Sequence, residues 1–236
     1  MNTKLREAQK LILQAFSHQA KDFALAGGTA LELYYLHHRF SADLDFFSPK
    51  FDSREINALV AAFKKHAGKK ISLESEFISE GRARVRFYTM SVKGSTRPLK
   101  IDFVEDVVIE HPLVRKFDGV RVYSAEDLYL HKIAAISGIR PVIDEVGRQI
   151  SEGRKEARDV FDVYMLSKKI RPLHLFLRKS PAQFQRGMIH WYRTFSRQEL
   201  KLALLDLDIY DAGFDGRELI VYLENEIKQF AREVVE

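Results

Sequence analysis

The residues best suited to chemistry lie near the start of the chain, where a glycine turn precedes two closely spaced aspartates. Residues 27–31 read Gly-Gly-Thr-Ala-Leu, and residues 41–47 read Ser-Ala-Asp-Leu-Asp-Phe-Phe. Successive side chains of a strand point to opposite faces, so Asp43 and Asp45 share one face while the apolar residues beside them share the other. Two neighbouring carboxylates repel each other, and a divalent cation with oxygen ligands, usually Mg²⁺, relieves that repulsion. We therefore expect Asp43 and Asp45 to bind Mg²⁺.

The glycine turn upstream of these aspartates predicts a phosphate site. Gly27, Gly28 and Thr29 open a helix, and the first backbone N–H groups of a helix have no partner within it. Such groups bind phosphate oxygens. A phosphate site next to a magnesium site indicates that the chain binds a metal–nucleoside triphosphate complex.

These residues resemble the signature of a known family. Residues 27–29 and 39–46 are similar to the signature of the AbiEii/AbiGii-type nucleotidyltransferases, the abortive-infection and toxin–antitoxin branch of the DNA polymerase β-like superfamily. Lys132 resembles the helix-borne lysine of that family, and residues 158–164 resemble its Arg-Asp-x-x-Asp-Leu element. The matching elements span roughly the first two-thirds of the chain in the family's order, and no specific likeness extends past about residue 168.

The resemblance implies an α+β fold. A polymerase β-like nucleotidyltransferase core with a small mixed sheet is expected over residues 1–123. A helical C-terminal region over residues 124–236 is expected to complete the active site. Many relatives carry serine after the glycines where this chain has Thr29, but the hydroxyl is retained.

The resemblance also implies an activity and partners. The expected reaction is Mg²⁺-dependent transfer of a nucleoside monophosphate from a nucleoside triphosphate (NTP) to an acceptor hydroxyl, with release of pyrophosphate. In some relatives the acceptor is the 3′ end of tRNA, and a cognate antitoxin restrains the protein as a toxin. The alternative is a non-catalytic nucleotide- or protein-binding module that kept the fold, but the full set of acids together with Lys132 argues against it.

Asp102 is the candidate for a third metal-binding carboxylate. Polymerase-type transfer uses two metal ions, and in the wider superfamily the third acid lies on a neighbouring strand. Asp102 interrupts the apolar strand expected over residues 99–104, so its carboxylate must face the cleft or find a partner. Pairing with Lys100 or an arginine at an edge strand is about equally compatible with the pattern.

Lys132 lies inside an apolar stripe of the helix that begins after Ser124. A lysine in that position either snorkels at the edge of the stripe or delivers its ammonium to an anion. Spacing alone favours snorkelling, whereas the family resemblance favours binding of the nucleotide.

Asp159 and Asp162 also permit two interpretations. Lys155–Asp159 and Arg158–Asp162 are ordinary i,i+4 pairs of a helix surface. Both aspartates nevertheless lie on the side of the helix that should pack inward. The resemblance implies a functional acid at Asp159 that orients the lysine or the nucleotide, while Asp162 is expected to hold an arginine or to cap the packing.

Composition limits the classes of protein to which the chain can belong. The 236 residues are 46% hydrophobic and 30% charged, and no segment approaches the roughly 20 apolar residues of a membrane span. The chain contains no cysteine, which excludes disulfides and thiol chemistry, and its first residues lack an apolar signal core. We expect a soluble cytoplasmic protein that has no membrane partner.

A mild excess of positive charge is compatible with nucleic acid. The formal net charge is +5, and Arg82, Arg84 and Arg86 alternate with apolar residues along one expected strand. In isolation this stripe is best explained as the solvent face of a half-buried sheet. Next to a nucleotide site, it is also suited to hold triphosphate or an RNA backbone.

Hydrophobic periodicity predicts the elements that carry these residues. After Ser124 the pattern is helical almost throughout, and Ser53 and Ser124 are expected helix caps. We expect helices over residues 3–16, 29–38 and 53–66, and strands over residues 23–26, 43–47, 71–78, 82–92, 99–104 and 119–123.

Overall fold

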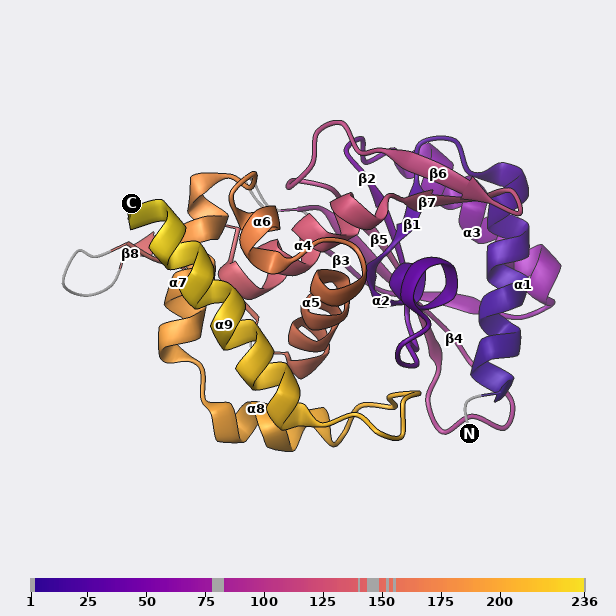
Figure 1. The fold of residues 1–236 in the computed structure, drawn as a ribbon. Helices are drawn as coiled ribbons and strands as arrows, with labels where there is room; N and C mark the ends of the chain where they lie inside the picture. Colours follow the sequence, from indigo (N-terminus) through magenta and orange to yellow (C-terminus); the bar gives the residue numbers. More distant parts are fainter. Residues whose placement is uncertain are drawn as a thin grey trace. The chain divides into compact units, whose positions relative to one another are not determined.

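The computed structural model describes residues 3–77, 83–139, 141–143, 149–151, 153–154 and 156–235 (Figure 1). The chain divides into two compact units, the first comprising Met1–Tyr35 and Ser41–Asp127 and the second Leu36–Phe40 and Leu128–Glu236. The division therefore falls four residues later than the predicted one, and the second unit takes a short segment from the first half of the chain. Among the described residues, no helix is long and apolar enough to cross a membrane.

The first unit is built on a mixed sheet that has seven strands among the described residues, in the order β3-β4-β5-β2-β1-β7-β6. Strand β2 pairs antiparallel with β1 and parallel with β5, so it lies between them in the middle of the sheet. The strands are β1 (Ala24–Ala26), β2 (Leu44–Ser48), β3 (Ile71–Phe77), β4 (Val85–Met90), β5 (Leu99–Glu105), β6 (Val114–Phe117) and β7 (Val120–Tyr123).

Aromatic packing fixes which face of the central strands is buried. Phe46 of β2 stacks on Phe16 with ring centroids 4.2 Å apart, and on Phe103 of β5 at 5.4 Å. Helix α1 (Thr3–Gln19), which carries Phe16, packs against α3 (Ser53–Ala67). Because side chains alternate along a strand, the residues on either side of Phe46 and Phe103 point to the opposite face.

The segment after β1 is a short α-helix, α2 (Gly27–Leu31), that continues as a π-helix, η1 (Glu32–Leu36). The predicted helix over residues 29–38 therefore begins two residues earlier and ends at Leu36. It ends there because His37 has a φ of 47°, which lies in the left-handed region.

The second unit is mainly helical, as predicted. Its helix α4 begins in the first unit, and Trp191 of α7 lies in the core, where it stacks on Phe195 at 4.4 Å. The helices are α4 (Ala125–Ser137), α5 (Ala157–Lys169), α6 (Leu173–Leu177), α7 (Ala182–Thr194), α8 (Arg197–Leu204) and α9 (Gly216–Val235), and a hairpin is formed by β8 (Pro141–Ile143) and β9 (Gln149–Ser151).

The predicted α+β class is confirmed, with differences in detail. Strand β6 and the antiparallel pair of strands β8 and β9 were not expected from the sequence pattern. Arg82 lies outside the described residues. The cap of α3 is Asp52, whose side chain accepts a hydrogen bond from the Arg54 N–H at 2.8 Å, whereas the sequence pattern favoured Ser53.

Replacing the cap should lower stability measurably. Asp52→Ala removes the acceptor at the start of α3 and should reduce the free energy of unfolding by about 1 kcal/mol. Ser53→Ala should have little effect, because Ser53 is already within the helix. Urea unfolding of the two variants checks this prediction, and equal losses would contradict the assignment of Asp52 as the cap.

Candidate functional site

Three aspartates of the first unit, Asp43, Asp45 and Asp102, form what we call the carboxylate cluster. Asp43 immediately precedes β2, Asp45 lies within it, and Asp102 lies in β5. Asp45 and Asp102 are direct register partners in the parallel pair β2–β5. Both are partly exposed and alternate with fully buried apolar residues, so their carboxylates share the face opposite the aromatic core.

Asp102 is held in an unfavourable electrostatic environment. Its burial raises the pKa of the carboxyl, and the nearby charges of Asp45 and then Asp43 raise it further, to about 7. Lys100 has the opposite but smaller effect. One carboxylate oxygen, Oδ1, is buried without a hydrogen-bond partner in the described structure. Of the two alternatives for Asp102, the structure therefore favours the one in which it faces the other carboxylates.

The glycine turn is shaped around Asp45. Gly27 has a φ of 66°, which favours glycine, and a Cβ at this position would lie 2.1 Å from Asp45 Oδ2. Only glycine therefore lets the turn approach the carboxylate so closely. Ala26, at the N-cap position, provides no side-chain acceptor for the first N–H groups of α2.

Buried polar side chains hold the loop that carries Asp43. The fully buried Thr29 hydroxyl donates to the backbone carbonyl of Asp43. The N–H of Ser41 donates to Glu32 at 2.9 Å, and Gln9 Nε2 donates to the Ser41 carbonyl at 2.9 Å. The Thr29 hydroxyl thus positions the aspartate loop, which leaves only the backbone of the turn to meet a phosphate.

The cluster has the chemistry of a cation site. As the side chains stand, no group of three His, Cys, Asp or Glu residues within the described ranges is arranged to hold a metal ion. The donors are nevertheless all carboxylate oxygens, which Mg²⁺ prefers. A cation would also relieve the repulsion that raises the pKa of Asp102 and would satisfy its buried oxygen. The residues therefore fit a divalent cation, although the side chains must adjust to bind one.

A second set of charged residues lies inside the helical unit. Lys132 of α4 contacts two fully buried carboxylates of α5, with its Nζ 2.7 Å from Asp159 Oδ1 and 2.8 Å from Asp162 Oδ2. Arg154 Nη2 lies 3.2 Å from the other oxygen of Asp159. Burial alone would lower the pKa of Lys132, but the two carboxylates outweigh it and raise the pKa.

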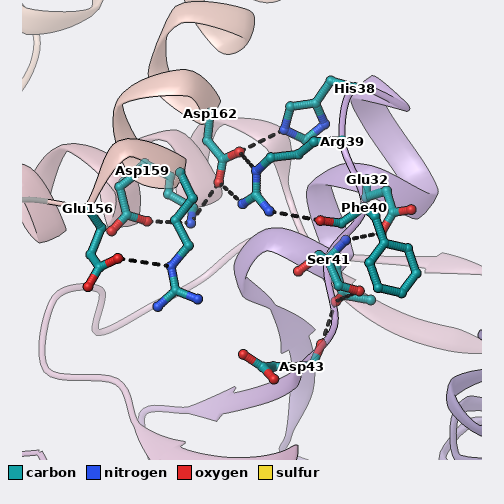
Figure 2. A network of polar contacts seen from close by, with 12 residues as sticks. Glu32, His38, Arg39, Phe40, Ser41, Asp43, Glu156, Asp159 and Asp162 are labelled. Carbon is teal, nitrogen blue, oxygen red and sulfur yellow. Dashed lines mark hydrogen bonds and ion pairs between the residues drawn. The ribbon is translucent and has the colours of Figure 1, made fainter. Parts of the chain in front are cut away.

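Asp162 connects this set to the segment Leu36–Phe40. Arg39 donates to both of its oxygens from Nε and Nη2, each at 2.7 Å, and His38 Nε2 lies 2.7 Å from Oδ1 (Figure 2). Burial opposes ionisation, but Lys132 and Arg39 hold the pKa of Asp162 well below its usual value. Burial lowers the pKa of His38, so the imidazole is neutral near pH 7. We call these five residues, His38, Arg39, Lys132, Asp159 and Asp162, the buried charge network.

The network bears on the alternatives left open by the sequence, while nucleotide binding by Lys132 stays a prediction. Lys132 is 7% exposed and does not snorkel to the surface. Asp162 holds an arginine as predicted, although the arginine is Arg39 rather than Arg158, whose Nε lies 3.9 Å from Glu156. The predicted partner of Asp159, Lys155, lies outside the described residues. The sequence reasoning missed His38 and Arg39, although Arg39 stands at the start of the quoted 39–46 motif.

The described arginines of the expected stripe are paired with acids. Arg84 donates to Glu105 at 2.9 and 2.6 Å, and Arg86 donates to Glu76 at 3.0 Å. Both pairs lie within the first unit. They account for Arg84 and Arg86 without a nucleic-acid ligand.

Comparison with known proteins shows both a family and a fold. The family described as nucleotidyl transferase AbiEii toxin, type IV TA system, matches residues 11–216. A protein of Helicobacter pylori described as a candidate nucleotidyltransferase is 20% identical, with a TM-score of 0.59 over 98% of this chain and 96% of its own. JHP933 of Helicobacter pylori is 20% identical, with a TM-score of 0.56 over 97% of this chain and 93% of its own. A search of curated proteins gives no match.

The raised pKa of Asp102 predicts the direction in which the stability of the protein changes with pH. The folded protein binds this proton more tightly than the unfolded chain, so ionisation of Asp102 lowers stability as the pH rises from about 4 to about 7. Asp102→Asn removes this loss. In metal-free buffer the variant should match the parent near pH 4 and exceed its free energy of unfolding by roughly 2 kcal/mol near pH 8. Denaturant titrations at both pH values test this, with the exposed Asp22→Asn as control, and a difference that does not change with pH would contradict it.

Removal of Lys132 should destabilise the helical unit strongly. The snorkelling interpretation would have left folding nearly intact, but Lys132→Met leaves two buried carboxylates with less compensation and should cost about 3–5 kcal/mol. Lys201→Met, at an exposed position, should cost much less. Adding Asp159→Asn to Lys132→Met should recover part of the loss, because it removes one of the stranded charges. Thermal and denaturant unfolding measure all three, and a loss below about 1 kcal/mol for Lys132→Met would contradict the network.

Proposed function

Because this chain belongs to the AbiEii nucleotidyl transferase toxin family, we propose that it transfers a nucleoside monophosphate from an NTP to an acceptor hydroxyl. The observation that carries the proposal is the carboxylate cluster. Asp45 and Asp102 are register partners on one sheet face. Burial, and then the charges of Asp45 and Asp43, raise the pKa of Asp102, and one of its buried oxygens has no hydrogen-bond partner in the described structure. Such a strained arrangement is costly for a protein that only folds, and it suits one that binds a cation.

Asp43, Asp45 and Asp102 are the residues that would hold Mg²⁺. The bound cation would neutralise the triphosphate and favour the deprotonated form of the attacking hydroxyl. The backbone N–H groups of Gly27, Gly28 and Thr29 would bind phosphate oxygens beside Asp45. The acceptor oxygen forms a bond to the α-phosphorus while the bond from that phosphorus to the bridging oxygen breaks, so pyrophosphate leaves.

The protein's own contribution to this reaction is positioning. Glu32, Gln9 and the Thr29 hydroxyl fix the backbone from which Asp43 and Asp45 project, which keeps their carboxylates together before any ligand binds. Catalysis of phosphoryl transfer depends mainly on such positioning and on charge neutralisation.

Lys132 and Asp159 have an indirect role in this proposal. Lys132 pairs with both Asp159 and Asp162. Asp162 also holds Arg39, which stands four positions before Asp43 in the chain. The buried charge network therefore anchors one end of the segment that leads into the aspartate loop. A direct contact of Lys132 with the triphosphate would require it to leave two carboxylates at 2.7 and 2.8 Å.

The family description also suggests the biological setting. We propose that the acceptor is RNA, with the 3′ end of tRNA as its reactive hydroxyl, and that a cognate antitoxin protein restrains the activity. The support is the name of the family, which includes a type IV toxin–antitoxin system, together with a formal net charge of +5.

The test is a transfer assay with matched variants. Total RNA is incubated with the protein, Mg²⁺ and each of the four NTPs labelled in the α-phosphate, and the labelled species is identified on a gel. Label should enter RNA, and Asp45→Asn should reduce it by about a hundredfold or more, because the charge that positions the cation is lost. The exposed Asp206→Asn should leave labelling unchanged.

Two outcomes of the assay would contradict the proposal. Label on protein instead of RNA would change the acceptor class. NTP binding without transfer to any acceptor would favour a non-catalytic binding module.

A further inference from the structure

An unusually basic surface lies at one end of the sheet in the first unit. Two stretches, residues 64–70 and 93–100, contain seven lysines and arginines and no aspartate or glutamate. We call them the lysine edge. All seven side chains are exposed, and none forms an ion pair with a described residue. The members are Lys64, Lys65, Lys69, Lys70, Lys93, Arg97 and Lys100.

Strand pairing brings the two stretches together. Ile71 at the start of β3 pairs with Met90 at the end of β4, which in turn pairs with Leu99 at the start of β5. The residues just before Ile71 and those between Met90 and Leu99 therefore lie at the same end of the sheet. The formal net charge of the whole chain is +5, so this single edge carries more positive charge than the chain's entire excess.

Helix termini explain only part of this charge. Lys64 and Lys65 lie in the last turn of α3, where cations are favoured by the helix dipole. Lys69 and Lys70 follow the left-handed Gly68 that ends the helix, and the remaining three lie in or after the β4–β5 turn. These five cations form no ion pair with any described residue and lie close together, so they repel one another, which favours a polyanionic ligand.

The lysine edge leads directly to the carboxylate cluster. Lys100 and Asp102 alternate with fully buried residues of β5, so they lie on the same sheet face two residues apart. The charge of Lys100 is close enough to lower the pKa of Asp102 against the other effects. A polyanion that runs along the edge and past Lys100 would bring its end to Asp102.

An exposed aromatic ring lies beside Asp102, where the lysine edge meets the carboxylate cluster. Phe87 of β4 is the register partner of Asp102 and lies on the same face, and 38% of its surface is exposed. Nucleic acid is the polyanion that carries flat aromatic groups able to stack on such a ring. Binding of an acidic protein segment or of an anionic membrane surface would not require an exposed aromatic ring.

We propose that the lysine edge binds the phosphate backbone of the acceptor RNA, and that Phe87 stacks on a base at its end. This inference rests on the proposed function for the identity of the acceptor. It assigns the RNA track to the lysine edge rather than to Arg84 and Arg86, which are already paired with Glu105 and Glu76.

The test measures RNA binding without NTP, so that catalysis is not involved. Fluorescence anisotropy with labelled bulk tRNA is recorded over a range of salt concentrations for the parent chain and for Lys69→Gln/Lys70→Gln/Lys100→Gln. The triple variant should bind at least about tenfold more weakly at about 0.1 M salt, and the slope of log K against log salt should fall by about 2 to 3. Lys21→Gln/Lys179→Gln/Lys201→Gln removes the same charge elsewhere and should leave both values nearly unchanged.

Phe87→Leu separates stacking from charge. It should weaken binding of a single-stranded RNA by about fivefold or more while leaving the salt slope unchanged. Thermal unfolding of each variant verifies that the fold is intact.

Equal effects of the two triple variants would overturn the proposal. So would unchanged tRNA binding of the lysine-edge variant with loss of its binding to anionic vesicles or to polyglutamate, since the edge would then serve a membrane or an acidic protein. RNA binding that follows the lysine edge, with no nucleotide transfer in the assay above, would instead refute the proposed function and leave the RNA-binding surface in place.

Discussion

Repulsion among three carboxylates is the constraint around which the first unit is organised. The aromatic core of Phe16, Phe46 and Phe103 fixes one face of β2 and β5, and this forces Asp45 and Asp102 onto the other face as direct neighbours. The sheet therefore cannot bury its core without bringing these charges together. The raised pKa of Asp102 and its unsatisfied oxygen are the visible cost of that arrangement, and a divalent cation would relieve both.

The surrounding residues keep the carboxylates close in spite of this repulsion. Gly27 leaves room for Asp45 where any Cβ would collide with it. Thr29 and Gln9 donate buried hydrogen bonds to the loop before it, and Glu32 accepts one from the Ser41 N–H. Within the second unit, Arg39 of the segment Leu36–Phe40 is held by Asp162 of the buried charge network. The hydrogen bonds among these supports are buried polar interactions whose loss is costly, so the loop is held in place before a ligand arrives.

The parts of this arrangement that depend on local pattern could be predicted from the sequence. The alternation of Asp43 and Asp45 with Leu44 and Phe46 identifies the open face, because the period of a strand is two. The break that Asp102 makes in an apolar strand identifies it as a residue in need of a partner. Both inferences use only neighbours in the chain.

The parts that depend on distant pairing could not be predicted in this way. The partner of Asp162 lies 123 positions away at Arg39, and nothing in either local pattern specifies it. The lysine edge joins two stretches whose proximity follows from the register of β3, β4 and β5, while each stretch alone resembles an ordinary helix end or turn. The π-helix after α2 could not be predicted either, since its apolar and polar residues follow a helical pattern that does not distinguish i→i+5 from i→i+4 hydrogen bonds.

The central claim is that Asp43, Asp45 and Asp102 act together as one cation site. It is tested most directly by anomalous diffraction from crystals grown with Mn²⁺, as a substitute for Mg²⁺, and a non-hydrolysable NTP. The account predicts a manganese peak about 2.1 Å from carboxylate oxygens of both Asp45 and Asp102. The triphosphate should then lie beside Gly27 and Gly28. Manganese bound only elsewhere, or a nucleotide bound with no metal at these aspartates, would contradict it.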